Sequence, residues 1–204
     1  MRIALCIAIL SLVGCNQQPT NASLSALADA GEHFSKVIGE PTGDPVYAPN
    51  VLIAAYEHAL VVWADKPSTK FHQLWPDGRH ISIDDPVLLS PHPWEDRGAM
   101  DKLFGCIQRG LEPPIGGVAK LWVADPATWD QLGCRLQSEW VSAYVQQHQK
   151  GFLIGPLPKV FGSKDKRKFV LMVSAGAWSS VDVEPLVSRI GEIPSILMRR
   201  SEQK

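Results

Sequence analysis

The stretch VLIAAYEHALVVW, residues Val51–Trp63, is a dense run of aliphatic, β-branched and aromatic residues. Such residues favour strands, because branched side chains pack well on a pleated surface. Glu57 and His58 interrupt the run near its middle, so it is no candidate for a membrane span, which needs about 20 apolar residues. The pattern predicts a core strand or a bent pair of strands.

The segments around this run predict a strand-rich α+β fold. Apolar residues recur at helical spacing over 23–37, and the turn sequence GEPTGDP follows them. Extended runs on either side of the sequence PDG predict a hairpin over 71–84. Further along, we expect a helix over 99–108, helical turns in KLWVADPATWDQLG, strands at GFLIG and KFVLMV, and a turn at Gly176.

Two segments of the chain share a frame, which suggests an internal repeat. FHQLWPDGRHISIDD aligns with FVLMVSAGAWSSVDV, and upstream AYEHALVVW aligns with QHQKGFLIG. A unit of one short helix, one strand and one hairpin cannot bury both faces alone, so two packed pseudo-repeats are expected. Chance similarity between β-rich segments is the alternative. The matched pairs are Phe71 with Phe169, Gly78 with Gly176, Asp84 with Asp182, Tyr56 with His148, and Gly39 with Gly133.

The composition is that of an ordinary globular protein. Of 204 residues, 45% are hydrophobic and 20% are charged, and 20 Lys+Arg against 21 Asp+Glu give a net charge of −1. Domains that bind nucleic acid usually carry an excess of basic residues. The sequence therefore predicts no nucleic-acid partner.

The N-terminus has the pattern of an export signal. Arg2 precedes an apolar run, residues 3–13, which is long enough for a signal-peptide core but too short to cross a bilayer. The run ends in Leu12-Val13-Gly14-Cys15, which resembles the lipobox of bacterial lipoprotein precursors. This resemblance implies cleavage before Cys15, acyl groups such as palmitate on Cys15, and, with Asn16 following, the outer membrane if the cell is Gram-negative. An ordinary signal peptide or an N-terminal anchor helix is the alternative.

The four cysteines then reduce to one candidate pair. Cys6 lies in the signal segment and Cys15 carries the lipid, which leaves Cys106 and Cys134. Two cysteines in an exported protein favour a disulfide, which would stabilise the fold by about 3–4 kcal/mol through chain entropy. Two buried free thiols are the alternative.

A longer segment carries a second resemblance. PPIGGVAKLWVADPATWDQLGCRLQSEW, with the later QQHQKGFLI, is similar to LGFP repeats of secreted and cell-wall-associated bacterial proteins, in two copies over about 30–183. His148, Gln149 and Gly155 depart from the repeat pattern. The resemblance implies an envelope-exposed binding or anchoring module and brings no catalytic residues. The residues that carry it are Gly117, Lys120, Trp122, Leu132, Gly133, Glu139, Gln147 and Gly151, and in the first copy Gly39, Tyr56, Glu57, Ala59 and Trp63.

Few residues offer metal or acid/base chemistry. His72 and His80 can approach each other across the predicted hairpin, but without a third ligand the sequence predicts no metal site. A glycan hydrolase needs two carboxylates that face each other across a sugar. The candidates for that role are the adjacent pairs Asp84-Asp85 and Glu95-Asp96.

Tryptophans near turns and loops are the candidate ligand-binding residues. Trp75, Trp94 and Trp178 have rings that could stack on sugars of an envelope glycan. The alternative is that these rings fill the core between the two pseudo-repeats.

Taken together, these patterns predict a lipid-anchored, extracytoplasmic, non-enzymatic protein that binds a cell-envelope polymer or protein partner and needs no cofactor. An envelope glycan hydrolase and an inhibitor or exclusion lipoprotein are the alternatives. The expected organisation is a signal peptide over 1–14, the lipidated Cys and a tether over 15–24, pseudo-repeats over 25–98 and 99–195, and a polar tail over 196–204.

Overall fold

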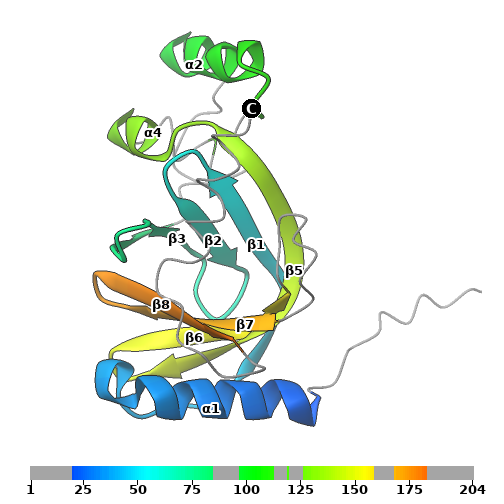
Figure 1. Cartoon of the computed structure of the whole chain (residues 1–204), viewed down its shortest axis with the longest axis vertical. Helices are drawn as coiled ribbons and strands as arrows, with labels where there is room; N and C mark the ends of the chain where they lie inside the picture. Colours follow the sequence, from blue (N-terminus) through cyan, green and yellow to red (C-terminus); the bar gives the residue numbers. More distant parts are fainter. Residues whose placement is uncertain (1–19, 85–96, 113–118, 120–125, 159–167, 183–204) are drawn as a thin grey trace, which may run out of the picture.

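The computed structural model describes residues 20–84, 97–112, 119, 126–158 and 168–182 (Figure 1). Within these residues the strands form a single antiparallel sheet in the order β4-β3-β2-β1-β5-β6-β7-β8. The elements in chain order are α1 (Asn21–Ile38), β1 (Val46–Tyr56), β2 (Leu60–Ala64), β3 (Lys70–Leu74), β4 (His80–Asp84), α2 (Arg97–Gln108), α4 (Pro126–Leu132), β5 (Arg135–His148), β6 (Gly151–Pro158), β7 (Lys168–Ser174) and β8 (Ala177–Asp182).

The sheet consists of two four-stranded meanders joined through their first strands. Strands β1–β4 make the first meander and β5–β8 the second, and β1 pairs with β5. The sheet curls into a nearly closed barrel (Figure 1), in which Arg79, directly before β4, forms a β-bridge with Ala177, the first residue of β8. The predicted bent pair of strands is confirmed as β1 and β2, with Glu57 and His58 at the bend.

Strand β5 is the element that no local sequence pattern predicts. Its 14 residues, RLQSEWVSAYVQQH, alternate only loosely between apolar and polar. The pairing of β1 with β5 also shifts register between Ala48 and Val51, which breaks the period of two. Because β5 joins the two meanders, the barrel could not be predicted without it.

The helix that precedes each meander covers the other meander. Helix α1 begins after Thr20, whose hydroxyl accepts a hydrogen bond from the Ser23 backbone N–H (3.3 Å). Its buried side chains pack against β6 and β7 of the second meander, while α2 and α4 lie at the opposite end of the sheet (Figure 1). The buried residues of α1 are Ala26, Leu27, Ala30, Phe34 and Ile38, and those that α2 and α4 bring to the first meander are Ala99, Cys106 and Leu132.

The end of α1 is bound to the turn between β5 and β6. Gly39 follows the helix with φ 74°, and the Lys150 backbone N–H donates a hydrogen bond to the Ile38 carbonyl (2.9 Å). A Cβ on Gly39 would lie 2.5 Å from Oε1 of Gln149. Glycine therefore suits this position both by its backbone conformation and by the space available.

The end of α4 is bound in the same way to the turn between β1 and β2. Gly133 follows the helix with φ 69°, and the His58 backbone N–H donates to the Leu132 carbonyl (3.1 Å). A Cβ on Gly133 would lie 2.7 Å from Oε2 and 2.8 Å from Cβ of Glu57. The C-terminal end of the helix before each meander is thus bound to the first turn of the other meander, and the two sets of contacts match.

The barrel interior holds a hydrophobic cluster to which both meanders contribute. At the tips of the meanders, the Trp178 N–H donates to the Gly78 carbonyl and the His80 N–H donates to the Gly176 carbonyl, both at 3.0 Å. This pair of bonds ties the two hairpin turns together. The cluster includes Ile53, Leu60, Leu74, Val145, Ile154, Leu171, Val173 and Trp178.

One expected residue match is wrong. Phe71 packs on the outer face of the sheet, whereas Phe169 points into the barrel interior. Leu74 pairs with His80, and Val173 pairs with Trp178, so the first hairpin has one more residue in its turn. A shift of one residue moves a strand side chain to the opposite face.

The predicted helices over 23–37 and 99–108 and the hairpin over 71–84 are confirmed by α1, α2 and β3–β4. The broad α+β, strand-rich class is also confirmed. The expected signal peptide, Cys15 and the polar tail lie outside the described residues. Within the described part of the chain, no helix is long and apolar enough to cross a membrane.

Candidate functional site

A cavity of about 300 Å³ lies at the mouth of the barrel, between the two meanders. Ligand sites are commonly concave, mostly apolar and about 300–1,000 Å³ in volume, with a few polar groups that orient the ligand. This cavity combines those features and is the candidate functional site. The second meander lines it with Val145, Phe152, Ile154 and Val173, and the first with Lys66, Ser68, Lys70, His72, His80 and Ser82.

Two histidines from the β3–β4 hairpin meet in the cavity wall. Strand pairing sets His72 opposite Ser82 and Leu74 opposite His80, so the two imidazoles are diagonal neighbours on the inner face. Nδ1 of His72 lies 3.1 Å from Nε2 of His80, and Nδ1 of His80 lies 2.8 Å from the Ser174 carbonyl oxygen. The approach of His72 and His80 predicted from the hairpin is therefore confirmed.

This chain of hydrogen bonds fixes the tautomer of each neutral ring. A carbonyl oxygen can only accept, so Nδ1 of His80 carries the hydrogen and donates to Ser174. The remaining nitrogen of His80 then accepts, and Nδ1 of His72 donates to it. The unshared electron pair of His72 is left on Nε2, where it can accept a hydrogen bond.

Both histidines are held in the neutral state by their surroundings. Burial is the main cause that lowers the pKa of His72 to about 3, and the nearby charges of His80 and Lys70 act in the same direction. Burial also lowers the pKa of His80, partly offset by its hydrogen bond to the Ser174 carbonyl. At neutral pH this pair acts as a set of hydrogen-bonding groups without charge.

The charged side chains in the cavity wall are basic. Lys66 and Lys70 belong to it, and no Asp or Glu is found among the described lining residues. Lys70 forms an ion pair with Asp84 (3.1 Å) on the exposed edge strand. Lys66 has no ion pair within the described part of the chain. The wall is therefore electrostatically suited to an anion.

Two of the tryptophans predicted as ligand-binding residues lie in the core. Trp75 and Trp178 are 5% and 2% exposed, and Nε1 of Trp178 donates to the Trp75 carbonyl (2.8 Å). Their rings fill the core, which is the alternative that the sequence left open, and they are not exposed for stacking on a sugar. Trp94 lies outside the described residues.

The four carboxylates proposed as acid and base of a hydrolase are not brought together within the described residues. Asp84 is exposed and paired with Lys70, and Asp85, Glu95 and Asp96 lie outside the described residues. Among the described residues, no group of three or more His, Cys, Asp or Glu is arranged to hold a metal ion.

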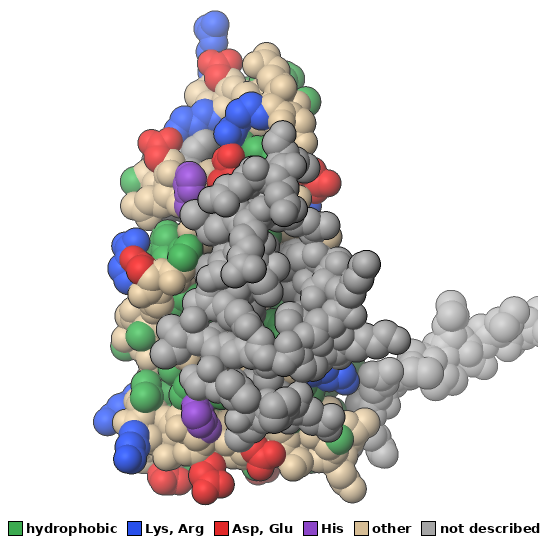
Figure 2. Space-filling model, in the orientation of Figure 1, with side chains coloured by type: hydrophobic (Ala, Val, Ile, Leu, Met, Phe, Trp, Pro, Cys, Tyr) green, Lys and Arg blue, Asp and Glu red, His purple; other side chains and the backbone are tan. Residues whose placement is uncertain are grey.

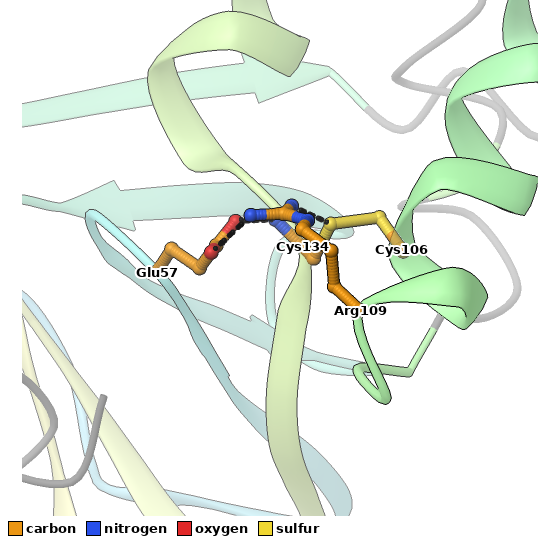
Figure 3. Close-up of polar contacts among 4 residues, drawn as sticks. All are labelled: Glu57, Cys106, Arg109 and Cys134. Atoms are coloured by element: carbon orange, nitrogen blue, oxygen red, sulfur yellow. Dashed lines mark hydrogen bonds and ion pairs between the residues drawn. A yellow bond between two sulfur atoms is a disulfide. The ribbon is translucent and has the colours of Figure 1, made fainter. Parts of the chain in front are cut away.

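The Cys106–Cys134 disulfide is present, with the two Cα atoms 5.7 Å apart, and it belongs to a polar cluster at the other end of the sheet (Figure 3). Arg109 binds both oxygens of Glu57 (2.8 and 3.0 Å) and donates to Sγ of Cys134 (2.6 Å). The Cys134 N–H also donates to Glu57 (2.7 Å). Burial raises the pKa of Glu57, but these hydrogen bonds outweigh it and hold that pKa below its usual range. The cluster ties the β1–β2 turn, α2 and β5 together.

The sequence predicts that the two histidines of the site meet, but it does not predict the residues that form the rest of the cavity wall. The β3–β4 hairpin is local in the chain, so its register can be predicted. Phe152 joins the site from β6, far along the chain, and Lys66 joins it from the turn between β2 and β3, and no local pattern marks either residue.

Among the described residues that face the viewer in Figure 2, acidic and basic side chains are interspersed. Comparison of the chain with protein-family models, with curated proteins and with solved structures finds no match.

Proposed function

We propose that this chain is an exported lipoprotein, held on a membrane through Cys15, that binds part of a cell-envelope polymer in the cavity at the barrel mouth without catalysing a reaction. The cavity carries this proposal, because it is concave, lined by both meanders and equipped with polar groups. A small concave site suits one unit of a polymer better than the flat surface of a folded protein.

Two further observations support export. The segment LVGC has the lipobox order of residues at the end of an apolar run. The Cys106–Cys134 disulfide is typical of proteins in oxidising compartments. Mass spectrometry of protein extracted from membranes would test the anchor. We expect a mature N-terminus at a diacylated Cys15, and an unmodified Cys15 would contradict this part of the proposal.

We also propose that the two meanders, each with its preceding helix, descend from one duplicated unit. The matching helix-end contacts at Gly39 and Gly133 support this, as do the matching tip contacts at Gly78 and Gly176. Sequences of orthologues provide a test. Each pair of glycines should be kept or lost together, and independent variation would count against duplication.

Retention on isolated cell-wall sacculi tests the binding function. The full chain, in non-ionic detergent, should co-sediment with sacculi, and the variant Ser82→Trp should not. Ser82 is exposed, lines the cavity and lies opposite His72, so an indole there would fill the mouth.

Ile81→Trp is the matched control for this experiment. Ile81 is the adjacent residue on β4, is 44% exposed and faces the opposite side of the sheet. We expect this variant to sediment like the original chain. Equal sedimentation of both variants with sacculi would rule out the cavity as the binding site, and specific capture of a protein instead would favour an inhibitor.

A further inference from the structure

The polar groups of the cavity define the chemistry of its ligand. We infer that the cavity takes a carboxylated sugar unit, in which the carboxylate lies at Lys66 and Lys70, a hydroxyl donates to Nε2 of His72, and the ring lies against Phe152. This inference rests on the proposed binding function and names its ligand class.

The charge requirement comes from the lysines. They are the charged side chains of the described lining, and Lys66 is free of ion pairs within the described residues. Lys70 shares its charge with Asp84, whose side chain is 88% exposed. An anionic ligand can therefore form a new ion pair with Lys66. It can also share Lys70 with Asp84 at a small desolvation cost, because the Lys70–Asp84 pair is exposed to solvent.

The hydroxyl requirement comes from the histidine pair. His80 uses both ring nitrogens, one on Ser174 and one on His72. His72 uses Nδ1 on His80, so its Nε2 is the acceptor left on this pair within the described part of the chain. A neutral ring with a fixed acceptor selects a donor, and a hydroxyl group supplies one.

The requirement that the ligand has a flat apolar face comes from the second meander. The Phe152 ring lies with its centroid 4.7 Å from that of His72, and Val145, Ile154 and Val173 continue the wall. The C–H face of a sugar ring packs against such a surface, and because Phe152 contacts His72, a hydroxyl at the edge of that ring can reach Nε2 of His72. A volume of about 300 Å³ is at the lower end for ligand sites, which suits one monosaccharide unit.

Calorimetric titration of the full chain with three small probes tests the inference. Glucuronate has a carboxylate and hydroxyls, glucose has hydroxyls without charge, and cyclohexanecarboxylate has a charge and a ring without hydroxyls. We expect glucuronate to bind about tenfold more tightly than either of the others, since each lacks one set of contacts worth about 1.4 kcal/mol. Equal binding of glucuronate and glucose, or of glucuronate and cyclohexanecarboxylate, would overturn the assignment.

Variants and spectra locate the contacts. The double variant Lys66→Gln/Lys70→Gln should weaken glucuronate about tenfold and leave glucose unchanged. In ¹⁵N-histidine NMR of the unchanged protein, the Nε2 resonance of His72 should move with glucuronate and stay in place with cyclohexanecarboxylate. A fixed resonance with both probes would exclude the hydroxyl contact, and this readout does not depend on the folding of a variant.

A fourth probe, an oligosaccharide that ends in glucuronate, distinguishes a polymer ligand from a free sugar acid. Binding of this oligosaccharide supports an envelope polymer, and binding of the monosaccharide alone supports a free sugar acid. If Ser82→Trp abolishes retention on sacculi while glucuronate fails to bind, the proposed function survives and the ligand class is wrong. If the Ser82→Trp variant is retained on sacculi like the original chain, the proposed function itself is wrong.

Discussion

The two meanders share one arrangement and differ inside the barrel. His80 and Trp178 occupy matching positions: the backbone of each donates to the turn glycine of the other meander, and the ring of each donates to a carbonyl there. His72 lies two residues before Leu74, and Leu171 lies two residues before Val173, the corresponding residue. The first meander therefore has two imidazoles where the second has Leu171 and Trp178. Both meanders contribute to the hydrophobic core, and the first departs from the second at these two positions, where the cavity lies.

The helices that cover the two meanders, α1 over the second meander and α2 with α4 over the first, differ as well. Helix α1 buries five residues against the second meander. Helix α2 buries Ala99 and Cys106, while Phe104 and Ile107 are 52% and 54% exposed. The weakly packed cover is the one that carries the disulfide and the Arg109–Glu57 pair. Covalent and polar bonds thus compensate for a small apolar contact.

Removing apolar contacts from the well-packed cover should have the largest effect. Phe34→Ala in α1 should lower the free energy of unfolding by about 3–5 kcal/mol, because the ring is buried against β6 and β7. Leu103→Ala in α2, where the side chain is half-buried, should cost less than half of that. Urea unfolding followed by tryptophan fluorescence measures both. Equal losses would show that the two covers do not differ.

Removing the disulfide should affect α2, the helix that covers the first meander. The double variant Cys106→Ala/Cys134→Ala opens a loop of sequence separation 28 and should lose about 3–4 kcal/mol of stability. Hydrogen exchange should show the loss first in α2 and the start of β5, with α1 protected as before. Uniform loss of protection across both covers would contradict a local role for the bond.

Acidification should destabilise the fold through the histidine pair of the first meander. The pKa of His72 is about 3 in the folded protein and about 6.5 when unfolded, so between these values the unfolded chain binds the additional proton. The free energy of unfolding should therefore fall as pH drops below about 6.5, by about 2 kcal/mol at pH 5 from His72, and the lowered pKa of His80 acts in the same direction.

Variants of the histidines isolate this contribution. His72→Gln removes the titrating ring and keeps a hydrogen-bond donor, so the fall of stability between pH 6.5 and 5 should become shallower. His33→Gln removes an exposed imidazole from α1 and is the matched control. An unchanged pH profile in His72→Gln would show that the buried pair does not control acid stability.

The smallest effects concern the turn glycines. Gly133→Ala should cost about 2 kcal/mol, because the residue has a positive φ and its Cβ would collide with Glu57. Gly78→Ala should cost about 1 kcal/mol, since φ is 85° but no atom lies within 4 Å of the new Cβ. The difference, measured by thermal unfolding, reports the helix-end contact. Equal costs would mean that Glu57 moves aside freely.

The sequence predicted the elements whose signals are local. The β1–β2 pair follows from a run of branched residues with a polar break, and the β3–β4 hairpin follows from PDG between extended runs. The meeting of His72 with His80 is a consequence of that hairpin register, and so it too could be predicted. Strand β5 has weak alternation and a register shift, so its signal is not visible in a short window.

By itself, the sequence determined which segments are helices and hairpins and which two cysteines can pair, because these properties depend on neighbours along the chain. The tertiary structure alone decided that each helix covers the other meander and that Phe152 shares a cavity with the two histidines. Those contacts join residues that are distant in sequence. They form only when β1 pairs with β5 and the sheet curls, and periodicity within single segments contains no information on that closure.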